Sequence, residues 1–167
     1  MNKNVERNYL EINSINELIP SKIKSIDYSI QLVNPDNFQL NKFFYKSVGK
    51  NHHWIDRLVW TDKQWIEYVS DKKVKTYILR KGEDLAGYFE LIFHTDKNEV
   101  EIAYLGLLKE YQNKKLGSIL LTTAIKNSFN ENVKRVWVHT CSLDHKNALK
   151  NYLSRGMKIF KKEKILI

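Results

Sequence analysis

The sequence predicts one α+β domain, in which a central mixed sheet is antiparallel at first, parallel later, and flanked by helices. Two features of the second half of the chain carry this prediction. Three β-rich segments lie between residues 74 and 107, and the short turns between them are typical of an antiparallel meander. A helical segment and a further strand follow, as expected for a right-handed parallel βαβ unit.

The amino-terminal part is expected to begin with strands. Residues 1–25 are assigned to an extension of the domain, with an outer strand over Asn4–Ile12. Apolar and polar residues alternate over Ile26–Val33, which predicts a second strand. No repeat and no Pro/Gly/Ser-rich linker divides the chain, so residues 1–167 are taken as a single domain.

Two helices are expected next. Proline is favoured at the first helical position, so a helix is predicted to begin at Asn34-Pro35 and to end at Gly49. Thr61 and Gln64 have the spacing of a capping box, which predicts the start of a second helix. The apolar residues expected to face the core are Leu40, Phe43, Phe44 and Val48 in the first helix and Trp65, Ile66 and Val69 in the second.

The second half of the chain supplies the sheet and its crossover. The meander strands are predicted over Val74–Arg80, Leu85–Phe93 and Glu99–Leu107. The crossover helix and its strand are predicted over Leu116–Phe129 and Arg135–Cys141. A last helix over Asp144–Arg155 is expected to bury Ala148, Leu149, Tyr152 and Leu153, and to end at Gly156 before strands over Met157–Phe160 and Lys164–Ile167.

Composition narrows the classes of function. The formal net charge is +9, but lysines are spread through every segment, which disfavours a dedicated nucleic-acid surface. Cys141 is the only cysteine, so an internal disulfide is excluded, and the histidines lack metal-ligand spacing. The first residues lack the apolar core of a signal peptide and no apolar run has membrane-spanning length, so a cytoplasmic protein without a membrane partner or metal is expected.

The segment from Leu107 to Ser118 has the features of an anion site. It joins a strand to the start of a helix, where unpaired backbone N–H groups can hold phosphate. Lys114 and Lys115 add positive charge, and Gly117 allows a ligand to approach the backbone closely. Taken alone, the segment is better explained as an ordinary strand–helix turn that carries solvated lysines.

Two motifs extend this interpretation, because together they resemble the GNAT acetyltransferase superfamily from about Tyr28 to the end of the chain. The family loop reads Gln/Arg-x-x-Gly-x-Gly/Ala; Gln112 and Gly117 match it, Lys115 replaces the first glycine, and Asn113 is a further departure. The run Ala148-Leu149-x-x-Tyr152-x-x-x-Gly156-Met157 resembles the family signature Ala-x-x-x-Tyr-x-x-x-Gly-Phe. His145 stands where many members carry an asparagine that contacts CoA.

The resemblance implies that acetyl-CoA is a co-substrate. It assigns acetyl-CoA binding to Leu107, Leu108, Gln112, Asn113, Lys114, Lys115, Leu116, Gly117, Ser118 and His145. Backbone N–H groups near Leu107 and Leu108 would polarise the thioester carbonyl. Lys115 either pairs with a phosphate or crowds the groove, and a positive φ there would strain a lysine by roughly 1–2 kcal/mol.

The same resemblance implies two catalytic residues. An alkyl ammonium has a pKa of about 10.4, so the acceptor amine is almost entirely protonated at neutral pH and needs a base. Glu101 is the candidate base, with Glu90 and Glu99 as rivals. Strand parity places Glu101 on one largely apolar face with Ala103, Leu105 and Leu107, although an outward-facing glutamate is the alternative. Tyr152 matches the family tyrosine near the CoA sulfur and is the candidate acid.

Acceptor binding in this family usually falls to the first two helices and their connection. The candidates here are Tyr45, Trp54, Asp56 and Arg57, whose aromatic rings and carboxylate suit an amine. The expected activity is transfer of an acetyl group from acetyl-CoA to a primary amine by direct attack in a ternary complex. The alternatives are a non-catalytic acyl-CoA-binding GNAT-like domain and a basic nucleic-acid-binding module. The acceptor, the acyl preference and the oligomeric state, including a homodimer, stay open.

Overall fold

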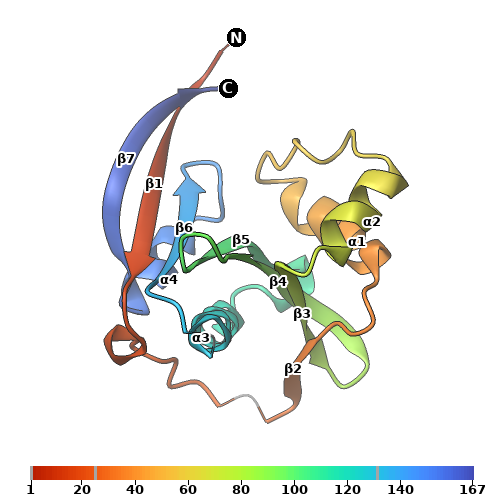
Figure 1. The fold of residues 1–167 in the computed structure, drawn as a ribbon, viewed down its shortest axis with the longest axis horizontal. Coiled ribbons are helices and arrows are strands. Elements are labelled where there is room, and N and C mark those ends of the chain that lie inside the picture. The colour runs from red at the N-terminus through yellow and green to blue at the C-terminus, as the bar shows by residue number, and fades with distance from the viewer. Residues whose placement is uncertain (1, 25, 131) are drawn as a thin grey trace.

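A seven-stranded mixed sheet runs through the protein in the order β2-β3-β4-β5-β6-β1-β7 (Figure 1). This computed structural model describes residues 2–24, 26–130 and 132–167, so Met1 and Ser25, the limits of the predicted extension, lie outside the described residues. The strands are β1 Asn4–Ile12, β2 Tyr28–Leu32, β3 Val74–Lys81, β4 Asp84–His94, β5 Glu99–Leu107, β6 Arg135–Cys141 and β7 Lys158–Leu166. The helices are α1 Phe38–Gly49, α2 Asp62–Ser70, α3 Leu116–Phe129 and α4 Ala148–Ser154, with short 3-10 turns η1 Ile15–Glu17 and η2 Lys109–Tyr111.

The predicted fold class is confirmed, and the sheet is less parallel than expected. Strands β5 and β6 form a parallel pair, and the other strand pairs that the structure describes are antiparallel. The prediction that the amino-terminal strand lies on the outside is wrong, since β1 pairs with β6 on one side and with β7 on the other. Long-range pairing of this kind depends on the carboxyl-terminal strand and leaves no local signal in the sequence.

The helices lie on opposite faces of the sheet, with α1 and α2 on one face and α3 and α4 on the other (Figure 1). Alternating side chains of the strands supply a core to each face. Ile78 and Tyr88 pack with Phe44 of α1, whereas the neighbouring Leu79 and Phe89 belong to the core beneath α3. The sheet therefore separates two apolar cores, one beneath α1 and one beneath α3.

The predicted helices are present with corrected limits. Helix α1 begins at Phe38, because the Asn37 side chain accepts a hydrogen bond from the Gln39 N–H and caps it; the predicted start at Asn34-Pro35 is wrong. The capping box of Thr61 and Gln64 is confirmed at the start of α2. Among the predicted core residues, Phe43, Ile66 and Leu153 are exposed.

The last helix is shorter than predicted, because the residues expected to form its first turn belong to the turn after β6. Asp144 accepts hydrogen bonds from the Thr140 hydroxyl at 2.5 Å and from the Cys141 N–H at 3.0 Å, so it closes the turn after β6. Helix α4 begins only at Ala148. The two predicted final strands are one continuous strand, β7.

An irregularity in β5 changes which residues share a face. The register shifts from Glu90↔Tyr104 to Leu91↔Ile102, so Ala103 is an extra residue in β5. Ile102, Leu105 and Leu107 consequently all pack on the core beneath α3. Glu101 precedes Ile102 and lies on the opposite face, so the predicted common face of Glu101, Leu105 and Leu107 is wrong.

Candidate active site

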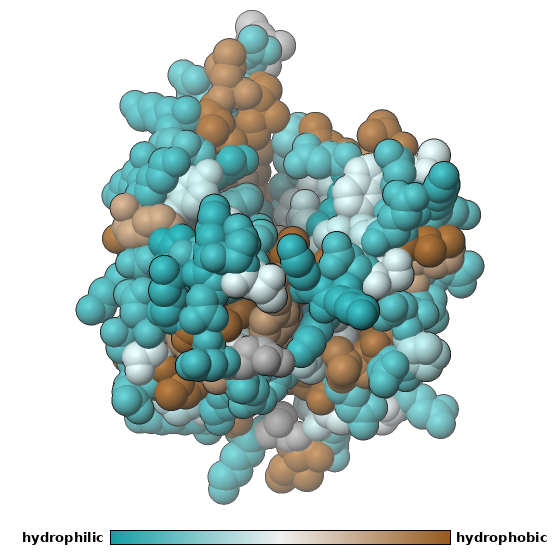
Figure 2. Space-filling view, in the orientation of Figure 1, coloured by the Kyte–Doolittle hydropathy of each residue, from teal (hydrophilic) through white to brown (hydrophobic). Residues whose placement is uncertain are grey.

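A cavity of about 1290 Å³ crosses the sheet from the α3 side to the α1–α2 side. Figure 2 shows the surface hollowed between the β1–β7 ribbon and the segment that connects α1 to α2. Most of the predicted site residues line this cavity, and they come from β5 and its loop, α3, the β6–α4 turn, α4 and the α1–α2 connection. The predicted residues that line it are Trp54, Asp56, Arg57, Glu101, Leu107, Gln112, Asn113, Lys115, Leu116, Gly117, Ser118, His145 and Tyr152.

The cavity exists because two parallel strands separate. The paired register of β5 and β6 ends at Glu101↔Trp137, and β5 continues to Leu107 beyond that point. Backbone N–H groups alternate in direction along a strand. The Leu108 N–H donates to the Ala86 carbonyl in β4 at 2.8 Å, so the Leu107 N–H points to the other side, into the gap.

The expectation for Leu108 is therefore corrected. Its N–H is used within the sheet, and its side chain packs on the α1 side rather than lining the cavity. Of the two backbone positions predicted to polarise a carbonyl, only Leu107 faces the gap between the strands.

The loop after β5 is shaped by residues with left-handed backbone. Asn113 and Lys115 each have φ +62°, in the left-handed region that favours glycine. The predicted strain at Lys115 is thus present, at roughly 1–2 kcal/mol. Lys115 is exposed and lines the cavity, whereas Lys114 lies outside it, with its ammonium 5.7 Å from the centroid of the Tyr111 ring.

The first turn of α3 is held open to the cavity. A Cβ built on Gly117 would meet nothing closer than the Asn151 amide nitrogen at 3.5 Å, so the open space there is available to a ligand. The Asn151 side chain donates to the Gly117 carbonyl at 2.9 Å and ties α4 to this turn. Gln112 donates to the Leu107 carbonyl at 3.4 Å and fixes the loop against β5.

His145 lies at the rim, in the turn before α4. Its Nδ1 accepts the Asn147 N–H at 3.1 Å, and its ring lies 6.0 Å from the ring of His52. Burial, and then the charges of His52 and Lys146, lower the pKa of His145. A neutral imidazole is therefore favoured at the position where many family members carry an asparagine.

Glu101 lies at the point where β5 and β6 separate, on the face that carries α1 and α2. Its carboxylate is 2.9 Å from Nε2 of His94, whose ring stacks on Trp137. Its two rivals are engaged elsewhere and do not line the cavity, since Glu90 pairs with Arg57 and Glu99 with Arg135. Glu101 is the one of the three glutamates that reaches the cavity.

Tyr152 reaches the cavity from the α3 side. The side chain is buried, and burial together with the negative charge of Asp144 raises the pKa of its hydroxyl well above the ordinary value. The hydroxyl is therefore protonated at neutral pH, as a proton donor must be.

The acceptor candidates divide into two pairs. Trp54 lines the cavity, packed 4.7 Å from the ring of Tyr104, and the exposed Asp56 lies beside it. Tyr45 is fully buried and does not line the cavity; its hydroxyl accepts the Arg57 N–H at 3.0 Å. Tyr45 therefore supports the connection from within the core.

The Arg57 side chain is fixed by an ion pair and by aromatic rings within the protein. Its guanidinium donates to Glu90 at 2.9 Å, and Glu90 also accepts from Tyr68 at 2.7 Å and from Asn41 at 3.0 Å. The same guanidinium lies 4.1 Å from the ring centroid of Tyr68 and 4.4 Å from that of Tyr104. Sequence reasoning missed this network, for which the only signal was a glutamate inside the apolar run of β4.

Three further side chains of the site were missed. His94 ends β4, whereas Asn151 lies in α4 and Arg155 caps its end, and no motif joins the three in the sequence. Across the described ranges, no group of three or more His, Cys, Asp or Glu side chains could hold a metal ion. None of the described helices has the length and apolar character needed to cross a bilayer.

Comparison with known proteins identifies the family of this chain. A family model for acetyltransferases of the GNAT family matches residues 32–157. No curated protein matches the chain.

Solved structures agree in fold at low sequence identity. A GCN5-related N-acetyltransferase from Kribbella flavida is 12% identical with a TM-score of 0.70, and the match covers 96% of this chain and 57% of that one. A GCN5-related N-acetyltransferase from Sphaerobacter thermophilus is 12% identical with a TM-score of 0.71, covering 97% of this chain and 50% of that one. An aminoglycoside acetyltransferase from an uncultured soil sample is 12% identical with a TM-score of 0.64, and the match covers 77% of this chain and 87% of that one.

The chain thus spans about half of the length of the first two of these proteins. The family match, in contrast, covers most of the chain and includes the loop, α3 and the Tyr152 motif. The protein therefore belongs to the GNAT family of acetyltransferases.

Proposed function

We propose that the protein transfers the acetyl group of acetyl-CoA to a primary amine by direct attack in a ternary complex. The observation that carries the proposal is the gap between β5 and β6, which joins a loop suited to phosphates on the α3 side to Glu101 on the other side. The open space at Gly117 and the cationic Lys115 fit the pyrophosphate of the co-substrate.

The residues divide the chemistry between the two faces. The thioester of acetyl-CoA supplies an activated acetyl group. The Leu107 N–H donates to its carbonyl oxygen, which becomes negative as the amine nitrogen attacks. A C–N bond forms and the C–S bond breaks; Glu101 takes the proton of the amine through water, and the Tyr152 hydroxyl protonates the leaving thiolate.

The acceptor would enter between the α1–α2 connection and the β1–β7 ribbon. Trp54 offers an aromatic face and Asp56 a carboxylate to an ammonium group. Within this proposal Arg57 and Tyr45 hold the connection in place and do not contact the acceptor. A cytoplasmic location and a homodimer remain predictions.

Calorimetry tests the proposal first. Acetyl-CoA should bind in the micromolar range, CoA comparably and ATP much more weakly, and Gly117→Trp should abolish binding by filling the space beside α3. Gly82→Trp, in the β3–β4 turn, is the matched control: its φ of +60° should cost some stability, but a Cβ there would meet nothing within 4 Å, so binding of acetyl-CoA should be unchanged. An absence of acetyl-CoA binding to the wild-type chain would contradict the proposal.

Turnover separates the enzyme from a binding domain. An amine panel with a thiol-detecting assay should reveal CoA release that Glu101→Gln and Tyr152→Phe each lower by about 10²-fold. Binding without turnover of any amine would favour the non-catalytic acyl-CoA-binding domain. Steeply salt-dependent binding to DNA or RNA would favour the nucleic-acid-binding module.

A further inference from the structure

Three segments meet beside the first turn of α3 and close a pocket there. Asn151 of α4 donates to the Gly117 carbonyl at 2.9 Å. The Ser21 hydroxyl lies 2.7 Å from the Ser118 hydroxyl, which ties the segment 19–23 to the same turn. The Ile19 N–H donates to the Arg155 carbonyl at 2.9 Å, so this segment also touches the end of α4.

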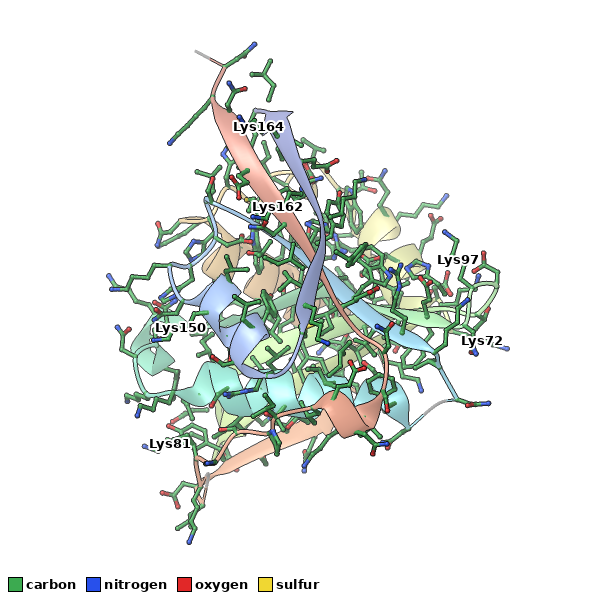
Figure 3. All side chains as sticks on the ribbon, turned by 90° about the vertical axis from the view of Figure 1, so that its left-hand side faces the viewer. Lys72, Lys81, Lys97, Lys150, Lys162 and Lys164 are labelled. Atoms are coloured by element: carbon green, nitrogen blue, oxygen red, sulfur yellow. The ribbon has the colours of Figure 1, made fainter. Side chains whose placement is uncertain are left out.

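Each of these segments brings a cation to the cavity. Lys22 comes from segment 19–23, Lys115 from the cap of α3, and Lys150 and Arg155 from α4 and its end. Figure 3 shows Lys150 on α4, which lies across the first turns of α3. Four positive charges therefore gather around one end of the cavity.

No acidic side chain among the described residues lines this end of the cavity. Those that line the cavity are Asp56, Glu101 and Asp144, which belong to the α1–α2 connection, the start of β5 and the β6–α4 turn. The cavity is thus polarised, with cationic side chains alone where segment 19–23 meets α4. An unbalanced cluster of this kind attracts a polyanion.

Arg155 is the member whose environment is least satisfied. Its Nε is buried and has no hydrogen-bond partner among the described residues. Burial lowers the pKa of this guanidinium, and no described carboxylate offsets the effect. A partly buried guanidinium without an anion is costly, and an oxyanion would remove that cost.

We propose that Arg155 and Lys22, with segment 19–23, form a site for a phosphate monoester, which in acetyl-CoA is the 3′-phosphate of the ribose. The inference rests on the proposed function and deepens it. The pyrophosphate would occupy the loop at Lys115 and Gly117, so the remaining cations are available to a further phosphate. Ile19 and Ile23 are 54% and 38% exposed at the same place and offer apolar surface to the adjoining base.

The segment that completes this site lies outside the family match. Residues 19–23 precede the span 32–157 that the family model covers. The nucleotide end of the site is therefore built partly outside the family match, by segment 19–23 with Lys22, and partly within it, by Arg155.

The experiment compares acetyl-CoA with acetyl-3′-dephospho-CoA by calorimetry on the full chain. The wild-type protein should bind acetyl-CoA at least about tenfold more tightly, as expected for charge-assisted hydrogen bonds to the phosphate. Arg155→Gln and Lys22→Gln should each bring the ratio of the two dissociation constants toward one, with little change in the affinity for the dephosphorylated analogue. Lys97→Gln is the matched control, because the exposed Lys97 lies in the β4–β5 turn and does not line the cavity, and it should keep the wild-type ratio.

The outcomes distinguish the two levels of the proposal. A wild-type ratio near one, or a ratio that Arg155→Gln and Lys22→Gln both leave unchanged, overturns the phosphate site while the proposed function stands. Failure of the wild-type chain to bind either compound overturns the proposed function itself. Thermal melting monitors folding of Arg155→Gln, and Lys22→Gln, on an exposed side chain, carries the test if that variant does not fold.

Discussion

Replacing Glu90 with glutamine should destabilise the protein strongly, because it leaves the Arg57 guanidinium buried without a counter-charge. The Arg57–Glu90 pair has an N–O distance of 2.9 Å, and the side chains are 8% and 0% exposed. Breaking a buried ion pair by removing one partner costs about 3–5 kcal/mol. A domain of this size is stable by about 5–15 kcal/mol, so the loss is a large share of the total.

Urea unfolding monitored by tryptophan fluorescence measures this loss, and the midpoint of thermal unfolding should fall by roughly 6–20 °C. Lys42→Gln is the matched control, because it breaks an ion pair with Asp62 whose side chains are 33% and 66% exposed, and it should cost at most about 1 kcal/mol. A second variant, Arg57→Met with Glu90→Gln, should recover part of the loss, since no unpaired charge remains.

The reasoning is refuted if Glu90→Gln costs no more than the Lys42→Gln control. That result would mean that water or a rearranged side chain compensates Arg57. The pair would then not hold the α1–α2 connection, and Arg57 would again be a candidate for acceptor binding.

Four further predictions concern the loop, the last turn and the catalytic residues. Lys115→Gly removes a lysine from φ +62° and should raise the free energy of unfolding by about 1 kcal/mol in urea titrations. The affinity for acetyl-CoA should fall, because the positive charge is lost. A lower stability of the variant would contradict the strain argument. Gly156 has φ +99°, and a Cβ there would lie 2.2 Å from the Glu17 carbonyl oxygen, so Gly156→Ala should lower the free energy of unfolding by more than about 1 kcal/mol. An unchanged midpoint of thermal unfolding would disprove this close approach. His94→Ala should lower kcat with no change in the acetyl-CoA dissociation constant. His94→Gln should restore part of the rate, because glutamine can keep a hydrogen bond to Glu101, the predicted base. Equal rates for the two variants would argue against a positioning role for His94. Because its raised pKa keeps the Tyr152 hydroxyl protonated, pH–rate profiles should show no loss of the acid up to about pH 10, and a falling limb that Tyr152→Phe removes would refute this assignment.

Much of the secondary structure was predictable because its signals are local. Alternation defined the meander strands to within one or two residues, and helical spacing of apolar residues gave both limits of α3, Leu116 and Phe129. The capping box at Thr61 gave the start of α2. The start of α4 was misplaced, because the Asp144 carboxylate bonds back to the end of β6, a contact that spacing along the helix does not reveal.

The site was predictable where it is a contiguous motif. Residues of the loop from Gln112 to Ser118, except Lys114, lie with Tyr152 in one cavity, as their family pattern implies. The roles of isolated residues were less accessible, since they depend on partners distant in the chain. Arg57 is an example, because its partner Glu90 is separated from it by a helix and a strand.

The sequence by itself determined the elements and the antiparallel-then-parallel order of the meander and βαβ unit, and it placed two lysines in the loop before α3 and a glycine in the first turn of that helix. These depend on residue spacing, which local sterics and hydrogen bonding translate directly into structure. Only the tertiary structure decided that β1 lies between β6 and β7, that the extra residue Ala103 turns Glu101 to the α1–α2 face, and that Arg155 meets segment 19–23 beside α3. The physical reason is that pairing between distant strands, strand irregularities and the matching of buried charges are settled by the packing of the whole chain, which no short segment encodes.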